Sequence, residues 1–196
     1  LCFSITPLIK NSPALYELRT KGPLAQYKKH DYKIIANIPY NITGAILEKF
    51  LSTEFQPKTL VLLVQNEVAK RIVARDKKES ILSISVKAYG TPVYIQKVLR
   101  GSFYPIPNVD SAILAIEDIS RKNFEDETIE GLFFKIVKTG FSHKRKKLIG
   151  NLKEYMPHIQ WGDVFNDLSI DTNVRAEDIE LATWIRISKH IKDINI

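Results

Sequence analysis

The chain is poor in residues that would mark it as a secreted, metal-binding or membrane protein. Its only cysteine, Cys2, excludes an internal disulfide and predicts a reducing, cytoplasmic environment. Its four histidines show no metal-ligand spacing with one another or with Cys2, so we expect no metal site. The longest strongly apolar run, residues 60–64, is much too short to cross a bilayer, so we expect no membrane association.

Closely spaced glycines are also absent. The eight glycines lie nine or more residues apart, so the chain contains no Gly-x-Gly-x-x-Gly loop of the kind that binds dinucleotides. Residues 1–32, before the first clear strand, are too few for the two or more βα units in half of a doubly wound sheet. The sequence therefore does not predict a complete nucleotide-binding half-domain.

What is present is a globular composition with two kinds of periodicity. Hydrophobic residues make up 44% of the chain, which is enough for a buried core and for one or two domains. The polar stretch 120–127 predicts a boundary, and the apolar spacing beyond it is helical. We therefore predict an α/β domain over residues 1–120 and a small all-helical domain over 121–196. Before the boundary, the patterns predict strands over 58–65, 93–99 and 111–118, a helix over 66–75, a charged loop over 75–80 and an ambiguous segment over 81–89.

The segment 34–47 reads as a short strand, a turn and a helix opened by Thr43. The turn holds Asn37, Pro39 and Tyr40. Open α/β sheets bind ligands at the carboxyl ends of their strands, which is where this turn would lie. An amide, a fixed carbonyl and a flat ring would then be together at the place where a ligand binds.

The residue types of this turn suit an adenine amino group, which is a poor nucleophile because its lone pair is delocalised into the ring. Two oxygen acceptors can hold its N–H groups: the side-chain oxygen of Asn37 and the backbone carbonyl of Ile38, which Pro39 biases towards an extended conformation. Stacking of Tyr40 on the base can contribute about 1–3 kcal/mol to the free energy of binding. The alternative is structural, with Asn37 and Thr43 as turn and cap residues and Tyr40 packed on the sheet.

A second aromatic residue follows in the segment 102–113. Pro105 and Pro107 stiffen an extended loop before the next apolar run, so Phe103 would lie at the mouth of the next strand pair and could face Tyr40. The alternative is that Phe103 plugs the core beneath a proline-rich turn.

Positive charge is concentrated in residues 135–153. This stretch has seven Lys or Arg residues and no Asp or Glu, whereas the remainder has 22 of each sign, so the whole net charge of +7 lies there. Such a concentration predicts contact with a polyanion such as RNA, and the alternative is a solvated basic helix face. The predicted RNA-binding residues are Lys135, Lys138, Lys144, Arg145, Lys146, Lys147 and Lys153.

Four motifs occur in a fixed order along the chain. They are Asn-Ile-Pro-Tyr-Asn-Ile-Thr at 37–43, Val-Gln-Asn-Glu-Val-Ala-Lys-Arg-Ile at 64–72, Phe-Tyr-Pro-Ile-Pro-Asn-Val-Asp-Ser-Ala at 103–112, and Phe-Ser-His-Lys-Arg-Lys-Lys at 141–147. Together they resemble the small-subunit rRNA adenine dimethyltransferases of the kasugamycin-sensitivity type. The resemblance runs from about Lys33 to the end, including Arg-Ala-Glu-Asp-Ile at 175–179, whereas residues 1–32 fit it poorly.

The resemblance implies a fold and a reaction. The fold is an α/β, Rossmann-like S-adenosylmethionine-dependent methyltransferase domain, N-terminally incomplete here, followed by a helical RNA-contacting domain. The reaction is transfer of methyl groups from S-adenosylmethionine to the amino groups of two adjacent adenosines near the 3′ end of 16S rRNA, during ribosome maturation. The implied partner is small-subunit rRNA or the precursor of the small ribosomal subunit, and we expect a monomer.

The resemblance also implies residue roles. The position matching Asn37 lies beside the methyl donor and, with the carbonyl of the position matching Ile38, binds the target amino group. Pro39 belongs to the same catalytic motif. The match of Tyr40 stacks on the adenine, and the match of Phe103 closes its other face.

One departure from the family leaves the function open. Full-length members bind the donor with a glycine-rich loop and an acidic residue, and this sequence lacks the loop; it also begins with Leu1 and has its only methionine at Met156. We therefore expect a chain without its N-terminal portion, or a lineage that has lost donor binding. Two alternatives to small-subunit dimethylation stand: a donor-less RNA-binding, ribosome-assembly or transcription-factor relative, and a large-subunit rRNA methyltransferase of the macrolide-resistance type, against which residues 109–112 argue.

Overall fold

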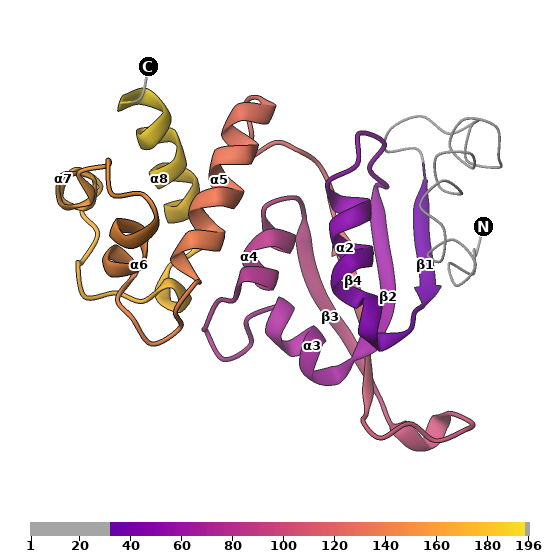
Figure 1. Ribbon diagram of the computed structural model, residues 1–196. Helices are drawn as coiled ribbons and strands as arrows, with labels where there is room; N and C mark the ends of the chain where they lie inside the picture. The colour runs from indigo at the N-terminus through magenta and orange to yellow at the C-terminus, as the bar shows by residue number, and fades with distance from the viewer. Residues whose placement is uncertain (1–31, 195–196) are drawn as a thin grey trace. The chain divides into compact units, whose positions relative to one another are not determined.

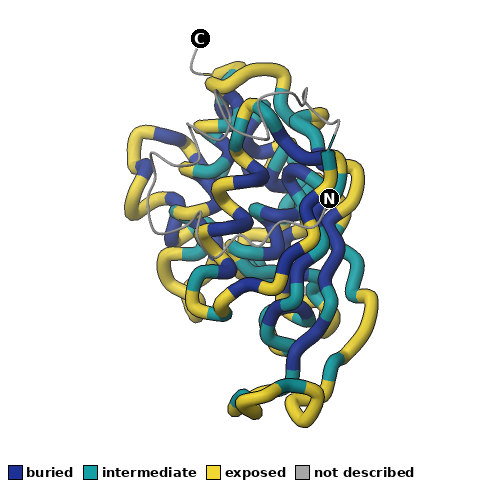
Figure 2. The backbone as a smooth tube through the Cα atoms, turned by 90° about the vertical axis from the view of Figure 1, so that its right-hand side faces the viewer, coloured by how far each residue is buried: buried dark blue, intermediate teal, exposed yellow. Residues whose placement is uncertain are grey.

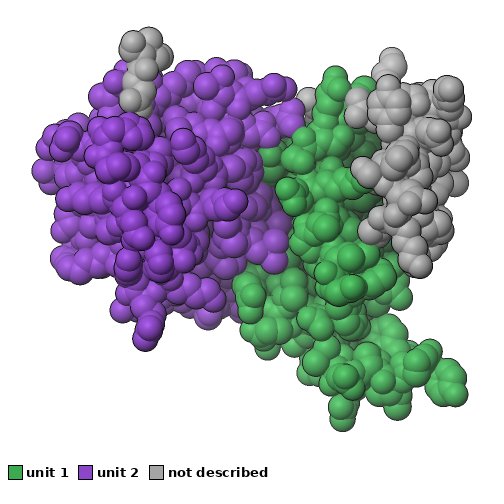
Figure 3. Space-filling model, viewed as in Figure 1, with its two compact units in different colours: residues 1–73, 89–120 green, residues 74–88, 121–196 purple. Residues whose placement is uncertain are grey.

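The computed structural model describes residues 32–194, and predictions about residues 1–31 lie outside this part. Contacts divide the chain into two compact units, coloured separately in Figure 3. The sheet unit comprises residues up to 73 and residues 89–120, and the helical unit comprises residues 74–88 and 121–196. Residues 74–88 thus group with the helices, and the assignment of separate roles to two domains stays a prediction.

The sheet unit is built on four strands in the order β1-β2-β4-β3 (Figure 1). β1 (Lys33–Asn37) pairs in parallel with β2 (Thr59–Gln65). β2 pairs antiparallel with β4 (Ser111–Glu117), which in turn pairs antiparallel with β3 (Thr91–Val98). The predicted strands are confirmed, and the sheet is mixed.

The two central strands carry the core of this unit. Leu60 and Leu62 of β2 and Leu114 and Ile116 of β4 are completely buried, because both strands are apolar on the face that packs against helices. β3 lies at an edge of the described sheet, where its Pro92 is tolerated because an edge strand does not need every N–H group for pairing.

Two helices and two short 3-10 turns complete the described part of the sheet unit. α2 (Thr43–Leu51) buries an apolar face that includes Ile46, Leu47 and Phe50, which matches the predicted helix after Thr43. α3 (Asn66–Ile72) follows β2 directly. The 3-10 turns are η1 (Tyr40–Ile42), between β1 and α2, and η2 (Arg100–Ser102), after β3.

The topology brings three connections to one edge of the sheet. β1 and β2 are parallel, so both end there, and β4 begins there because its Ser111 pairs with Gln65 at the end of β2. β3 ends there as well, since Val98 also pairs with Ser111. The β1–α2 turn, the start of α3 and the β3–β4 loop over residues 99–110 therefore lie at the same edge, where the loop projects beyond the strands (Figure 1).

The helical unit contains the remaining elements. They are α4 (Ile81–Lys87), α5 (Glu127–Gly140), α6 (Leu148–Tyr155), α7 (Trp161–Asp167), the 3-10 turn η3 (Ala176–Asp178) and α8 (Leu181–Ile194). The ambiguous segment 81–89 is helical because Ser80 and Ser83 form a capping box. The Ser80 hydroxyl accepts from the Ser83 N–H at 3.1 Å, and the Ser83 hydroxyl accepts from the Ser80 N–H at 2.7 Å.

The core of the helical unit is aromatic. Phe133, Trp161, Phe165 and Trp184 are completely buried. Each indole N–H finds a backbone carbonyl, with Trp161 donating to Met156 at 3.0 Å and Trp184 to Ile179 at 3.2 Å, so the rings are buried without an unpaired donor.

The side chain of Asp126 links the start of α5 to the end of α8. The Asp126 carboxylate accepts from the Ile129 N–H at 2.8 Å and from Lys192 at 2.8 Å, and these two bonds, that of Lys192 first, lower the pKa of Asp126. The longest helices, α5 and α8, have 14 residues each, and within residues 32–194 no helix is long and apolar enough to cross a membrane.

Candidate functional site

The connections at the carboxyl edge of β1 line an open surface cavity of about 390 Å³, a size typical of small-molecule sites. It brings together all five residues that the sequence predicted as catalytic, although they come from two segments more than sixty positions apart. The lining residues are Asn37, Ile38, Pro39, Tyr40, Phe103, Tyr104, Pro105 and Pro107. The predicted meeting of the two motifs is therefore seen, and the roles of the individual residues stay predictions.

The backbone at the end of β1 decides which side chains reach the cavity. Strand alternation continues beyond the last paired residue, so Ala36 and Ile38 are buried while Asn37 and Pro39 are exposed. Pro39 has extended dihedral angles (φ −59°, ψ 132°), and its carbonyl accepts from the Ile42 N–H at 3.2 Å to start the turn. The alternation thus presents the Asn37 amide at the cavity while Ile38 anchors the strand in the core.

The ring of Tyr40 is fixed by its hydroxyl group. The Tyr40 hydroxyl lies 2.6 Å from Oγ of Ser111, the first residue of β4, and the Ser111 side chain is completely buried. On the other side of the residue, Oγ1 of Thr43 donates to the Tyr40 carbonyl at 3.0 Å. These bonds hold the ring in one orientation, so part of a stacking platform would be organised before a base arrives.

The β3–β4 loop is held at its base by Asp110. Its carboxylate accepts from Lys97 at 2.8 Å and from the Arg100 N–H at 2.9 Å, so it links the end of β3 to the start of the loop. The bond from Lys97 and that from the Arg100 N–H lower the pKa of Asp110, because both stabilise its ionised form. The backbone carbonyl of Asp110 also accepts from the Asn66 N–H at 3.0 Å.

The chemistry of the cavity is that of an uncharged, partly aromatic site. Among the described residues 32–194, none of those that line it is a carboxylate, a histidine or a lysine. Asn37 offers an amide oxygen, which accepts hydrogen bonds, and Tyr40 and Phe103 offer ring faces. Such a site can hold a flat base and its amino group, and it contains no group suited to general base catalysis near pH 7.

A second, more polar cavity of about 480 Å³ lies on the same edge. Gln65 and Glu67, from the second family motif, line it where β2 meets α3. Nearby, the Asn66 side-chain oxygen accepts from the Tyr94 hydroxyl at 2.7 Å. The lining residues are Gln65, Asn66, Glu67, Arg100, Asn108, Val109 and Asp110.

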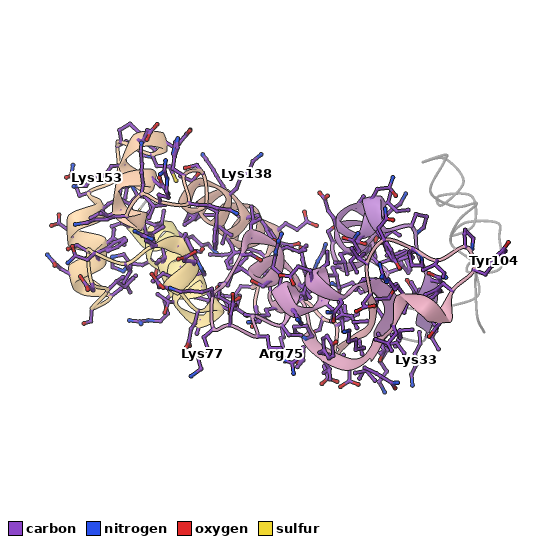
Figure 4. The ribbon with its side chains drawn as sticks, turned by 90° about the horizontal axis from the view of Figure 1, so that it is seen from below. Lys33, Arg75, Lys77, Tyr104, Lys138 and Lys153 are labelled. Atoms are coloured by element: carbon purple, nitrogen blue, oxygen red, sulfur yellow. The ribbon has the colours of Figure 1, made fainter. Side chains whose placement is uncertain are left out.

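All seven predicted RNA-binding cations are exposed, and all belong to the helical unit. Lys135 and Lys138 lie one turn apart on α5, residues 144–147 lie in the loop between α5 and α6, and Lys153 lies on α6. Figure 4 shows Lys138 and Lys153 on one side of the helical unit and Lys77 on the opposite side. Their role in binding a polyanion stays a prediction.

We call residues 141–147 the basic loop, and its backbone has a defined support. The buried side chain of Asn151 donates to the carbonyl of Gly140 at 2.6 Å and to that of His143 at 3.1 Å. Lys147 donates to the side chain of Asn173 at 2.7 Å, and Lys146 pairs with Glu154 at 2.8 Å, which lowers the pKa of Glu154. The loop is thus held by its backbone while most of its charges point to solvent.

In the sequence, Ser111 and Asp110 are quoted within a motif without being given a role, and Asn151 is not singled out. Ser111 and Asp110 stand in the motif that follows Phe103, but their hydrogen bonds join segments that are distant in sequence. An apolar-spacing pattern cannot reveal such bonds. A buried asparagine such as Asn151 on the apolar face of an amphipathic helix was the one available signal.

The described residues differ in how they suit a metal ion and a methyl donor. Within residues 32–194, no group of three or more His, Cys, Asp or Glu side chains is placed to hold a metal ion. The cavity is lined by the Asn37 amide beside apolar and aromatic side chains, and no glycine-rich loop occurs in this sequence to cradle the nucleotide portion of a donor.

Comparisons with known proteins agree with the motifs. A family model described as ribosomal RNA adenine dimethylase matches residues 6–193. The ribosomal RNA small subunit methyltransferase A of Dehalococcoides mccartyi (strain CBDB1) is 38% identical over 160 residues, which are 80% of this chain and 54% of that protein. The protein of the same name from Fusobacterium nucleatum is 36% identical over 168 residues, 85% of this chain and 64% of that protein. The chain therefore spans 54–64% of the length of these relatives.

Solved structures show the same fold. A dimethyladenosine transferase from Plasmodium falciparum has a TM-score of 0.72 and 22% identity, covering 95% of this chain and 80% of that one. The 23S rRNA methyltransferase ErmE has a TM-score of 0.65 and 18% identity, covering 93% and 79%. The predicted Rossmann-like α/β fold is thus confirmed.

The comparisons correct one prediction and decide between relatives. Residues 1–32 were expected to fit the family poorly, but the family match begins at residue 6, so most of this segment belongs to it. The curated relatives carry the small-subunit name, so the macrolide-resistance alternative is not favoured. With a family match over nearly its whole length, the chain belongs to the ribosomal RNA adenine dimethylases.

Proposed function

We propose that this protein takes part in dimethylating the amino groups of two adjacent adenosines in small-subunit rRNA, with S-adenosylmethionine as the methyl donor. The observation that carries the proposal is the cavity in which Asn37, Tyr40 and Phe103 meet at the carboxyl edge of the sheet. Its size and its uncharged lining suit an adenine extruded from an RNA strand.

In this reading, Tyr40 and Phe103 hold the two faces of the base. Stacking on an aromatic ring contributes about 1–3 kcal/mol per base, which offsets the few kcal/mol needed to unstack it. The bond from the Tyr40 hydroxyl to Ser111 fixes one ring beforehand, so less entropy is lost on binding.

Asn37 acts on the reacting nitrogen. Its side-chain oxygen and the carbonyl of Ile38 accept hydrogen bonds from the two N–H groups of the amine. These bonds favour a tetrahedral nitrogen, whose lone pair is no longer conjugated with the ring. S-adenosylmethionine, when bound, supplies an electrophilic methyl group next to Asn37. The nitrogen lone pair would form the new N–C bond as the S–C bond of the sulfonium breaks and the donor leaves as the neutral thioether. The excess proton would pass to water, since within residues 32–194 no carboxylate or imidazole lines the cavity.

The basic loop and the lysines of α5 and α6 would bind the phosphates of the same RNA. Their exposure leaves most of them available for phosphate contacts, which dominate nucleic-acid affinity without reading sequence. We further propose a cytoplasmic monomer whose partner is the precursor of the small ribosomal subunit.

The direct test has two measurements. One is methyl incorporation into small-subunit particles by a catalytically active form of the protein, and the other is RNA binding by the chain itself. We expect binding of a single-stranded RNA with two adjacent adenosines to weaken when the target base is replaced by an abasic nucleotide. Equal affinity for both RNAs would contradict an adenine site in this cavity.

A second candidate is an RNA-binding relative that does not use the donor, and the glycine spacing favours it for this chain. We predict that the 196-residue chain binds S-adenosylmethionine weakly or not at all, because it offers no glycine-rich loop for the nucleotide portion. Calorimetric titration decides this point. Tight binding would show that another segment holds the donor and would remove the argument for this candidate.

A further inference from the structure

The residue after Phe103 faces away from the core and has no role in the site described so far. Tyr104 has a relative exposure of 101%, the highest of the large hydrophobic side chains in residues 32–194. Figure 4 shows its ring projecting from the β3–β4 loop, and Figure 2 shows that loop as largely exposed, in contrast to the buried strands it joins. A fully solvated ring on a shaped loop is a candidate contact surface.

The backbone places Phe103 and Tyr104 on opposite sides of one extended segment. Phe103 has φ −122° and ψ 150°, and successive side chains of an extended chain point to opposite sides. Phe103 is accordingly half-buried and Tyr104 exposed, yet both line the adenine cavity. Tyr104 therefore lies at the mouth of the cavity, outside the position where the target base would sit.

The loop restricts the backbone that carries Tyr104. Pro105 and Pro107 restrict the backbone on one side of it, and Asp110 clamps the loop base to Lys97 and to the Arg100 N–H. A restricted backbone lowers the part of the ordering cost that the loop would otherwise incur when the ring binds, which favours stacking.

We propose that Tyr104 stacks on the nucleobase next to the target adenosine in the RNA strand. This inference rests on the proposed function, because a base inside the cavity forces its neighbours to pass the mouth, where Tyr104 stands. An extruded base leaves its neighbour with one unstacked face, and an aromatic side chain can cover it. Tyr104 is then a positioning residue, and with it the site recognises two adjacent bases instead of one.

A nucleobase fits this surface better than a protein or a lipid. The ring adjoins a cavity that suits a base. Arg100, at the start of the same loop, is exposed and lines the second cavity on this edge, so it offers a cation for a phosphate of the RNA. Stacking does not read the base edge, so Tyr104 would favour purines by their larger area without selecting one of them.

The test is a binding cycle between protein variants and RNAs with single abasic positions. Single-stranded RNAs contain two adjacent adenosines, or an abasic nucleotide at the target, at its 5′ neighbour or at its 3′ neighbour. We expect wild-type affinity to fall about 5- to 150-fold for one neighbour-abasic RNA, the equivalent of one stacking contact. Tyr104→Ala should lose the same factor on intact RNA and become insensitive to that neighbour, while it still discriminates against the target-abasic RNA.

Two control variants separate the ring from the loop. Tyr104→Phe keeps the ring and should behave as wild type. Ile106→Ala removes a side chain of the same loop that is 65% exposed and does not line the cavity, and it should also behave as wild type.

The outcomes distinguish this inference from the proposed function. If Tyr104→Ala remained as sensitive as wild type to both neighbour-abasic RNAs, the role of Tyr104 would be overturned while the adenine site stood. If the wild-type protein ignored the target-abasic RNA, the proposed function would fail, and the inference with it.

Discussion

The cavity in the sheet unit and the basic loop in the helical unit are built on opposite principles. In the part of the chain that the structure describes, no charged residue lines the cavity, which depends on shape, with Ile38 buried as an anchor and Tyr40 bonded to Ser111. The basic loop depends on charge, and its lysines and arginine are exposed with few partners. In the proposed function, the cavity recognises one base and the basic loop attracts the phosphate backbone. The two parts of the chain should therefore respond to different substitutions and conditions.

The largest expected effect belongs to the cavity. Asn37→Ala removes an acceptor that matters most as the amino nitrogen becomes tetrahedral, so turnover should fall by about 10²–10³-fold. RNA affinity should barely change, because the acceptor contributes little in the ground state. Methyl incorporation and particle binding are measured in parallel on a form of the protein that turns over. Normal methylation by a folded variant would return Asn37 to the role of a turn residue.

The basic loop should respond to salt instead. If Lys144, Arg145, Lys146 and Lys147 each contact a phosphate, replacing all four by Ala should reduce the slope of log affinity against log salt by about 3, at roughly 0.7–0.9 per contact. The loss should be equal for all RNA sequences. A matched control replaces four exposed cations elsewhere, Lys33, Lys49, Arg71 and Lys122, and should leave the slope nearly unchanged. Equal slopes for both variants would favour the solvated-face alternative.

Rigidity of the cavity can be tested at Tyr40. Tyr40→Ala should weaken RNA binding by about 1–3 kcal/mol through lost stacking. Tyr40→Phe keeps the ring but leaves the buried Ser111 hydroxyl without this partner, which should lower the free energy of unfolding by about 1–3 kcal/mol.

Adding Ser111→Ala to Tyr40→Phe removes both polar groups, and we expect most of the lost stability to return. Chemical denaturation of the two single variants and the double variant gives the coupling between the groups. Additive losses would mean that the 2.6 Å contact does not hold the ring.

The smallest expected effects concern the support of the basic loop, where α5 offers a matched pair of glycines. A Cβ on Gly140 would overlap the ring of Trp184 and lie 2.8 Å from Leu148, so Gly140→Ala should destabilise the protein by about 1–3 kcal/mol through overpacking. Gly131 meets nothing within 4 Å, so Gly131→Ala should stabilise by up to about 1 kcal/mol through helix propensity. The free energy of unfolding is measured for both, and equal signs would contradict this account of α5.

Much of the fold could be predicted because the local spacing of apolar residues indicates its strands and helices. The strands β2 and β4 are apolar runs, α5 and α8 have helical apolar spacing, and Thr43 stands at the start of α2. The segment of α4 could not be decided, since its apolar spacing fits two periods and only the hydrogen bonds of Ser80 with Ser83 favour the helix.

The sequence by itself determined which residues belong to the site, because Asn37 to Tyr40 and Phe103 lie in motifs whose chemistry is legible in the residue types. It also determined where the positive charge lies, since charge is a property of composition. Only the tertiary structure decided that the two motifs line one cavity, that Ser111 holds Tyr40 and that Tyr104 stands at the mouth. Those facts follow from the pairing of β2 with β4, and a long-range strand register cannot be read from the local pattern of either strand.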